Sequence, residues 1–218
     1  MKIKAEAIIF DMDGVITNTM PDHFCAWKII FRQEGIRVSH LDVYKREGQR
    51  GINSVKEIFK EHHLPLEKRK AREILARKEE LFKKIVKVRF ISGARRFLKF
   101  LHRNDFKLAL VTGTARHEVR KILPDGIYNL FDVVVTGSDV RFGKPHPEPF
   151  LKAVKKLKVK PGAAVVIENA PFGIRSAKAA GLKCLAVATS LPGRYLHDAD
   201  AIFSSIHDLQ GKVRFLKD

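Results

Sequence analysis

The sequence predicts an α/β fold, a Rossmann-like parallel sheet with helices on both faces, plus a small all-helical domain inserted after the first strand. Three observations lead to this prediction. Short apolar runs alternate with amphipathic stretches through most of the 218 residues, as in successive βαβ units. The runs are continuous and rich in Val, Ile, Leu and Ala, which is typical of parallel strands covered on both faces. Residues 17–89 break the alternation.

The expected strands are short apolar runs that end where polar or glycine-containing sequence begins. They lie at residues 7–10, 108–111, 133–135, 163–167 and 185–188, with a less pronounced run at 201–203. The helices expected between them lie at residues 94–103, 116–123, 147–157 and 172–180. Pro147 and Pro171 stand where the first turn of a helix tolerates proline. Gly181 is placed to end the last of these helices.

The inserted segment contains helical patterns and no convincing strand. Phe24, Trp27 and Phe31 fall on one helical face, and we expect Trp27 in the core of this module. A second helical face carries apolar residues opposite Lys and Arg, namely Ile74, Leu75, Leu81, Phe82, Ile85 and Val88. The predicted division is therefore a core domain of residues 1–16 and 90–218 and a helical cap domain of residues 17–89.

The chain is strongly basic, with 42 Lys and Arg against 24 Asp and Glu and a formal net charge of +18. Such a charge attracts polyanions, which makes a nucleic-acid-binding domain one class to weigh. The basic residues are spread out, and few Asn and Gln accompany the many Lys, Arg and Glu, which favours a solvated, thermophile-like surface. We therefore expect a small anionic substrate rather than a nucleic-acid partner.

Cysteine usage and hydropathy indicate the compartment. Cys25 and Cys184 are the only cysteines and neither belongs to a CxxC pair, so we expect free thiols in a reducing interior. No apolar run approaches the roughly 18 residues that cross a bilayer, and the first one is too short for a secretory signal. We therefore expect a cytoplasmic protein without membrane contact. The sequence leaves the oligomeric state open.

Polar side chains follow four of the expected strands. Ligands of open α/β sheets bind outside the carboxyl ends of the strands, so these side chains form the candidate site. Carboxylate and amide oxygens suit Mg²⁺, and a hydroxyl, an ammonium and backbone N–H groups suit a phosphoryl group. The residues are, in strand order, Asp11 and Asp13, then Thr112 and Gly113, then Lys144, then Glu168 and Asn169.

The first of these clusters has a spacing with chemical meaning. On an extended segment, residues two apart project to the same side, so Asp11 and Asp13 both face a substrate. Two carboxylates this close repel each other, and a divalent cation or a shared proton relieves the repulsion. One is then suited to act as a nucleophile and the other as a proton shuttle. Gly14 allows the chain to turn sharply beside them.

Four stretches resemble, in order, the four motifs of the haloacid dehalogenase superfamily. They read "DMDGVITNT", "VTGT", "GKPHPEPF" and "VVIENAPFGIRSAKAAG". The resemblance covers essentially the whole chain and points to the β-phosphoglucomutase-like branch, in which a helical cap follows the first motif. It implies a Mg²⁺-dependent phosphatase of a small phosphorylated metabolite, such as a sugar phosphate.

The resemblance also implies roles by position. Asp11 would attack phosphorus and form an aspartyl-phosphate, and Asp13 would protonate the leaving oxygen and then activate water. Thr112 and the Gly113 N–H would hold phosphoryl oxygens, and Lys144 would neutralise charge between the phosphoryl group and the nucleophile.

The implied Mg²⁺ ligands are the Asp11 side chain, the Asp13 carbonyl and the pair Glu168–Asn169. Family members commonly have two acidic residues at the last pair, so Asn169 removes one negative charge. We expect weaker metal affinity rather than lost function. Asn169 is also a candidate helix cap before Pro171.

Two cap residues are candidates for substrate binding, each with a plain alternative. His23, in "TMPDHFCAW", lies in a stretch close to that of β-phosphoglucomutases, whose histidine faces the active site; a solvent-facing helical histidine is equally compatible. Arg50, in "EGQRGINS", can reach a second phosphate or a sugar acid, or lie on the surface. No metal-binding spacing involves the remaining histidines considered, which we expect at the surface: His62, His63 and His146.

Three other functions compete with the phosphatase. A β-phosphoglucomutase would use the same site but protect its aspartyl-phosphate from water, and no residue decides between the two. Haloacid dehalogenation uses the same nucleophile without Mg²⁺, so Asp13 and the metal-ligand pattern speak against it. A non-catalytic nucleic-acid-binding domain would account for the charge, and its binding would weaken steeply with salt.

Overall fold

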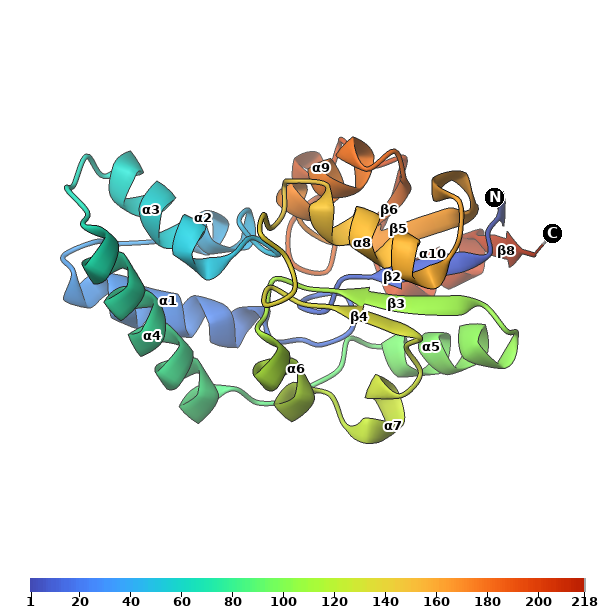
Figure 1. The fold of residues 1–218 in the computed structure, drawn as a ribbon, viewed down its shortest axis with the longest axis horizontal. Helices are drawn as coiled ribbons and strands as arrows, with labels where there is room; N and C mark the ends of the chain where they lie inside the picture. The colour runs from blue at the N-terminus through green and yellow to red at the C-terminus, as the bar shows by residue number, and fades with distance from the viewer. Residues whose placement is uncertain (218) are drawn as a thin grey trace.

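The computed structural model describes residues 1–217, and its centre is a parallel sheet of six strands in the order β4-β3-β2-β5-β6-β7 (Figure 1). This order places the first core strand in the middle and adds later strands on either side, which is a doubly wound arrangement. All six expected strands are present within two residues of their predicted ends. They are β2 (Ala7–Phe10), β3 (Lys107–Val111), β4 (Val133–Val135), β5 (Ala164–Glu168), β6 (Lys183–Val187) and β7 (Ala201–Phe203).

Helices cover both faces of this sheet, which confirms the predicted fold class. Alternate residues of one strand show the division: Ile8 and Phe10 pack into one apolar cluster, and Ala7 and Ile9 into the other. The first cluster is closed by α5 (Ala94–Arg103), α6 (Arg116–Ile122), α7 (Asp125–Tyr128) and α10 (Ile206–Lys212). The second is closed by α8 (Glu148–Leu157) and α9 (Pro171–Ala179).

Several short elements are absent from the sequence prediction. Strands β1 (Lys2–Lys4) and β8 (Arg214–Leu216) pair in parallel to form a separate sheet, and they join the two ends of the chain. Two 3₁₀ turns, η1 (Pro161–Ala163) and η2 (Gly193–Tyr195), also appear, as do α7 and α10. Each is at most seven residues long, so its sequence spans too few turns or alternations to give a periodic signal.

The ends of α9 show one prediction confirmed and one wrong. Gly181 has φ of +72°, and the Leu182 N–H donates to the Ala177 carbonyl, so a left-handed glycine ends the helix as expected. Asn169 does not cap the start. The helix begins at Pro171, so the N-cap position falls on Ala170, and the Asn169 amide donates to Ser190 instead.

Four helices occupy the inserted segment: α1 (Met20–Gln33), α2 (His40–Tyr44), α3 (Gly51–Glu61) and α4 (Lys68–Ile85). They gather on one side of the sheet-bearing part (Figure 1) and share an apolar cluster that contains Trp27 and Phe31. Trp27 thus lies in the core of the cap helices, as predicted. Val88 was expected on the apolar face of a helix, but α4 ends before it and its side chain is 43% exposed.

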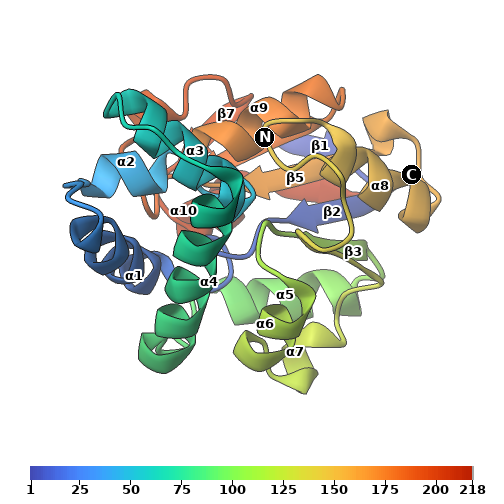
Figure 2. The ribbon, with the colours of Figure 1, turned by 60° about the vertical axis from the view of Figure 1, so that its left-hand side comes forward.

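The cap helices and the core meet along α4. Phe82 of α4 packs into the cluster under the sheet rather than into the cap cluster, and Figures 1 and 2 show α4 approaching α6. This contact sets the helices beside the carboxyl ends of the strands. The exact residues at which cap and core divide, 17 and 89, remain a prediction.

Three further expectations concern the cysteines, a membrane-spanning helix and three histidines. Cys25 and Cys184 are free thiols, the first exposed and the second buried. No helix within residues 1–217 has the length and apolar character to cross a bilayer. His62, His63 and His146 are exposed, as predicted.

Candidate functional site

The polar ends of three neighbouring strands meet at one edge of the sheet. β2 lies between β3 and β5, so Asp11, Thr112 and Glu168, which end or follow these strands, are brought side by side. The Asp11 N–H donates to the Ile167 carbonyl, which continues the β2–β5 ladder into the site. All three side chains are buried. The arrangement follows from strand order alone, because parallel strands point the same way.

Lys144 is the centre of the buried charges. Its ammonium group donates to Asp11 Oδ1 at 2.6 Å, to Glu168 Oε1 at 2.7 Å and to the Val111 carbonyl at 3.1 Å. Its side chain is 1% exposed. Burial alone would lower the pKa of Lys144, but the charges of Asp11 and Glu168 raise it overall. Lys144 therefore stays a cation, shared between two carboxylates.

The two carboxyl oxygens of Asp11 differ in their hydrogen bonding. Oδ1 accepts from Lys144, whereas Oδ2 is buried and has no hydrogen-bond partner in the described chain. Burial raises the pKa of Asp11 to about 8; Lys144 opposes this rise, and Glu168 and Asp13 add to it. Burial therefore works against the ionised form of Asp11, and a metal cation beside Oδ2 would favour that form.

Asp13 is held by hydroxyl groups. Its Oδ1 accepts from Thr19 Oγ1, and its Oδ2 accepts from Thr114 Oγ1 at 3.1 Å and Thr112 Oγ1 at 3.5 Å. His23 Nε2 lies 3.4 Å from Oδ1. Burial alone would raise the pKa of Asp13, but the contact with His23, together with the Thr19 and Thr114 hydroxyls, lowers it overall. The two aspartates thus differ in surroundings although they lie two positions apart.

Two buried oxygen atoms at the strand ends fit Mg²⁺. Besides Asp11 Oδ2, the Asn169 Oδ1 atom is buried without a partner, and both are oxygen ligands of the type that Mg²⁺ prefers. No set of three or more His, Cys, Asp or Glu within residues 1–217 is arranged to hold a metal. A site here therefore needs the Asn169 amide and a backbone carbonyl, such as that of Asp13, in addition to carboxylates.

Two glycines keep this space open. A Cβ atom on Gly14, which has φ of +90°, would lie 2.0 Å from Asn169 Nδ2, and one on Gly173 would lie 1.6 Å from Glu168 Oε1. Neither contact can be relieved without moving a candidate ligand. Glu168 Oε2 in turn accepts from the N–H groups of Asn169 and Ala170 at 2.7 and 3.0 Å, which fixes its orientation.

His23 faces Asp13 rather than solvent. The side chain stacks on Phe82 with ring centroids 4.0 Å apart, and Nδ1 lies 2.9 Å from Lys78 Nζ. Burial and the Lys78 charge lower the pKa of His23, an effect that Asp13 partly opposes. Of the two placements considered from the sequence, the structure has the one at the site.

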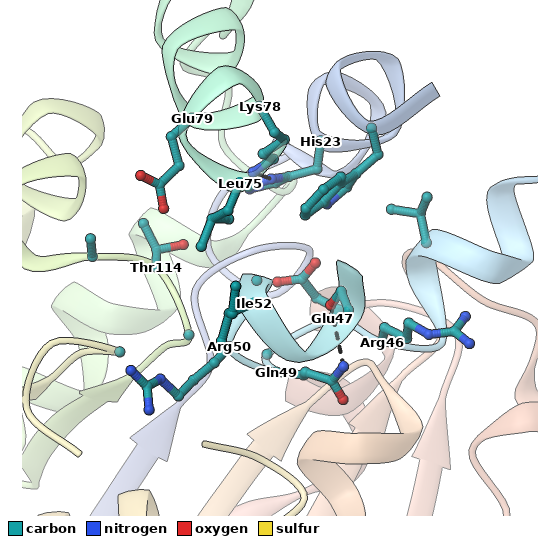
Figure 3. A pocket seen from close by; sticks show the side chains of 18 of the residues that line it. His23, Arg46, Glu47, Gln49, Arg50, Ile52, Leu75, Lys78, Glu79 and Thr114 are labelled. Atoms are coloured by element: carbon teal, nitrogen blue, oxygen red, sulfur yellow. Dashed lines mark hydrogen bonds between the residues drawn. The ribbon is translucent and has the colours of Figure 1, made fainter. Parts of the chain in front are cut away.

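The loop between α2 and α3 closes over the core. Gly48 packs on the Lys144 side chain, since a Cβ atom there would lie 2.6 Å from Lys144 Cδ. A Cβ atom on Gly113 would lie 2.7 Å from the Gly48 carbonyl. Arg50 lines the cavity described below, but its guanidinium donates to the Arg141 carbonyl at 2.7 Å, and Figure 3 shows the side chain pointing away from Glu47. Its expected contact with a second phosphate remains a prediction.

A cavity of about 400 Å³ lies between the cap helices and the core (Figure 3). Asp11 and Asp13 do not line it, but His23, Gly113 and Thr114 do, and two of these contact Asp13. The cavity therefore opens from the Asp13 side of the site. Other lining side chains come from both parts of the chain: Trp27, Glu47, Gln49, Lys78, Glu79 and Glu118.

Sequence reasoning missed several of these residues. Thr19 is the last residue of the first quoted motif, and Thr114 is the last residue of the second. The available signal was that both motifs end in a residue with a hydroxyl group. Lys78 and Glu118 gave no signal, because both sit on amphipathic helices in which a charged residue usually faces solvent. They are buried.

Comparison with known proteins supplies independent findings. A family model described as haloacid dehalogenase-like hydrolase matches residues 8–187. The chain is 33% identical over 206 residues to the phosphorylated carbohydrates phosphatase of Thermotoga maritima, covering 90% of this chain and 92% of that protein. It is 28% identical to the validoxylamine A 7'-phosphate phosphatase of Streptomyces hygroscopicus subsp. limoneus, covering 93% and 94%.

A second group of similarities is to β-phosphoglucomutases. The chain is 30% identical to the beta-phosphoglucomutase of Bacillus subtilis, covering 94% of this chain and 91% of that protein. The solved structure of a candidate beta-phosphoglucomutase from Bacteroides vulgatus superposes with a TM-score of 0.87 at 31% identity, covering 96% and 88%. These similarities extend over nearly the whole chain and are not limited to the strand-end motifs.

Proposed function

Since this chain belongs to the haloacid dehalogenase-like hydrolase family, we propose that it is a Mg²⁺-dependent phosphatase of sugar phosphates and similar small metabolites. The family and the enzyme class predicted from the sequence, a phosphoric monoester hydrolase, are confirmed by the matches. The observation that carries the proposal is the buried Asp11–Lys144–Glu168 cluster, in which Asp11 keeps one free oxygen. The relatives named as phosphatases of phosphorylated carbohydrates and of validoxylamine A 7'-phosphate support the substrate class.

Asp11 and Asp13 divide the chemistry between them. The Asp11 carboxylate attacks phosphorus, the bond to the ester oxygen breaks, and Asp13 gives that oxygen a proton. Water then attacks the aspartyl-phosphate while Asp13 takes its proton, which releases phosphate and restores Asp11. Its position supports this role, because Asp13 contacts Thr114 and His23, which both line the cavity.

Lys144, Thr112 and Gly113 act on the transferring group. The Lys144 ammonium lies 2.6 Å from Asp11 Oδ1 and supplies positive charge beside the point at which negative charge builds up. The Thr112 hydroxyl and the Gly113 N–H stand at the end of β3 and are suited to hold phosphoryl oxygens.

Asp11, Asn169 and the Asp13 carbonyl would hold Mg²⁺, with Glu168 nearby. When bound, the ion supplies charge that favours ionised Asp11 and offsets the phosphoryl oxygens. The two unpartnered oxygens support this assignment.

The test is hydrolysis of an aryl phosphate. We expect activity that needs Mg²⁺, that EDTA removes and that Asp11→Asn abolishes, because an amide is a poor nucleophile. Asp198→Asn is the control, since its side chain is 46% exposed and lies outside the site. Turnover without metal, or full activity of Asp11→Asn, would refute the mechanism.

A second candidate function is β-phosphoglucomutase, which the identity to the Bacillus subtilis enzyme favours. Feeding β-glucose 1-phosphate with a trace of the bisphosphate separates the two. A phosphatase releases inorganic phosphate, whereas a mutase forms glucose 6-phosphate without a matching amount of phosphate. We expect the first result.

We infer a cytoplasmic enzyme without a nucleic-acid partner. The absence of such a partner is supported by the basic residues, which are spread over the sequence and not clustered. A filter-binding assay with DNA and RNA at rising salt tests it.

A further inference from the structure

We propose that Glu118 determines substrate specificity: its carboxylate accepts a hydrogen bond from a hydroxyl of the leaving group, and the surrounding cavity rejects leaving groups that carry a second anionic group. This role rests on the proposed phosphatase activity, and it assigns a neutral polyol as the part of the substrate beyond the phosphate.

The position of the cavity places the leaving group beside Glu118. Thr114 and His23 line the cavity and contact Asp13, which is the residue that protonates the leaving oxygen in the proposed reaction. The group attached to that oxygen must therefore extend into the space of about 400 Å³, which is a usual size for a small-molecule site. Glu118 lines this same space from the first turn of α6.

Glu118 presents an acceptor that no donor uses. The residue is 7% exposed, and its Oε1 atom has no hydrogen-bond partner anywhere in residues 1–217. Leaving a buried carboxylate oxygen unpaired is costly, and nearly all buried polar atoms in proteins are paired. A ligand hydroxyl in the cavity would supply the missing donor.

The other charges in the cavity disfavour a second anion. Glu47 from the cap loop and Glu79 from α4 also line it (Figure 3), and neither forms an ion pair within the described residues. Both therefore face the leaving group as further carboxyl groups. Burial raises the pKa of Glu47 and of Glu79, so each carries less negative charge than an exposed carboxylate. A second phosphate or carboxylate would still be buried beside three acidic groups, which is a repulsive element of the kind that sets specificity.

Two of the four Lys and Arg residues that line the cavity are paired with groups elsewhere. Arg46 contacts Glu57 and Glu61, and Arg50 donates to the Arg141 carbonyl. Arg72 is exposed at the rim. Lys78 is the buried exception, and it contacts His23 and lies over the Phe82 ring. Because Lys78 already supplies one positive charge, a neutral, hydroxyl-bearing group suits the space better than an ammonium does.

The experiment compares kcat/KM for three esters: a hexose 6-phosphate, the matching hexose bisphosphate, and an aryl phosphate without aliphatic hydroxyls. The variants are Glu118→Ala, which removes the acceptor, and Glu118→Gln, which keeps an acceptor without the charge. Asp125→Asn is the matched control, because its side chain is 86% exposed and lies outside the cavity.

We expect Glu118→Ala to lower the ratio of hexose 6-phosphate to aryl phosphate kcat/KM by about 10- to 100-fold, the usual effect of one hydrogen bond to a charged group. Glu118→Gln should lower that ratio less and raise kcat/KM for the bisphosphate about tenfold. Asp125→Asn should change neither ratio. Thermal unfolding confirms that the variants fold.

Two failures are distinguishable. If the unmodified protein hydrolyses none of the three esters, the proposed function is wrong and the role of Glu118 falls with it. If it hydrolyses them but Glu118→Ala and Glu118→Gln leave both ratios unchanged, or lower all three esters equally, the phosphatase stands and the specificity role of Glu118 is overturned.

Discussion

At the scale of single residues, Asp11 and Asp13 show how neighbours separate two identical side chains. One Asp11 oxygen is held by the Lys144 ammonium and the other is free, whereas Asp13 is surrounded by hydroxyl groups and His23. The first is suited to attack and to bind an ion. The second is suited to pass a proton to the cavity side.

Replacing Asp13 by asparagine tests this division. We expect Asp13→Asn to lower kcat by about 10²- to 10⁴-fold, because proton transfer is lost while the Asp11 nucleophile remains. Phosphate release after rapid mixing with an aryl phosphate measures the effect, and the variant should still bind Mg²⁺. A variant that retains more than a tenth of the activity would show that Asp13 is not the proton donor.

Asp139 gives a pH-dependent stability contribution away from the site. Its carboxylate accepts from Thr136 at 2.6 Å and pairs with Arg116 at 2.6 Å. Burial alone would raise the pKa of Asp139, but the Arg116 and Thr136 hydrogen bonds lower it to about 2. Because the pKa is lower in the folded state than in the unfolded chain, the stabilisation is present above about pH 4. It is lost as the pH falls toward 2.

The matching variant is Asp139→Asn. We expect it to lower the free energy of unfolding at pH 7 by about 1 kcal/mol, a figure that allows for solvent screening of a partly exposed pair. The difference from the unmodified protein should shrink as the pH is lowered from 5 to 2. Urea unfolding at several pH values measures it, and a difference independent of pH would contradict the assignment.

At the scale of elements, the loop between α2 and α3 decides how the cap helices meet the core. Gly48 has φ of +77° and lies against the Lys144 side chain, and Arg50 donates to the Arg141 carbonyl. The same loop covers Gly113, which is suited to hold the phosphoryl group. The loop between α2 and α3 therefore both joins the cap helices to the core and contacts the Lys144 side chain.

Gly48→Ala should disturb that link. A Cβ atom would lie 2.6 Å from Lys144 Cδ, so either the loop or Lys144 must shift, and we expect kcat/KM for an aryl phosphate to fall about tenfold or more. Gly35→Ala is the control, because Gly35 has a similar φ of +76° but nothing within 4 Å. Both variants carry backbone strain. An equal loss of activity in the two would show that strain alone, and not the cap contact, is responsible.

At the scale of the whole molecule, the charge of +18 acts on substrate encounter. A positive protein raises the local concentration of a phosphate ester, and salt screens this attraction. We expect kcat/KM to fall about tenfold between 10 and 500 mM NaCl while kcat changes little. Steady-state kinetics at constant Mg²⁺ measure it. An unchanged kcat/KM would show that the field does not guide the substrate.

Much of the fold could be predicted because its signals are local. The apolar runs at 7–10 and 133–135 correspond to β2 and β4 without a shift, and Gly181 ends α9 as its type requires. Asp11, Lys144 and Glu168 could be predicted to share one site, because they follow strands whose carboxyl ends meet at one edge of a parallel sheet. β1 and β8 could not be predicted, because their pairing joins residues about as far apart as the chain allows.

The sequence by itself therefore determined the sheet, its order of motifs and the polar groups at its edge, because periodicity and glycine or proline chemistry are properties of short segments. Only the tertiary structure decided which charges share an environment. His23 faces Asp13, Arg50 turns to Arg141, and Glu118 is buried with an unused oxygen. The reason is physical, because the burial and pairing of a side chain depend on the element packed against it. For His23 and Arg50, which belong to the cap helices and their loop, the partner residues belong to the core.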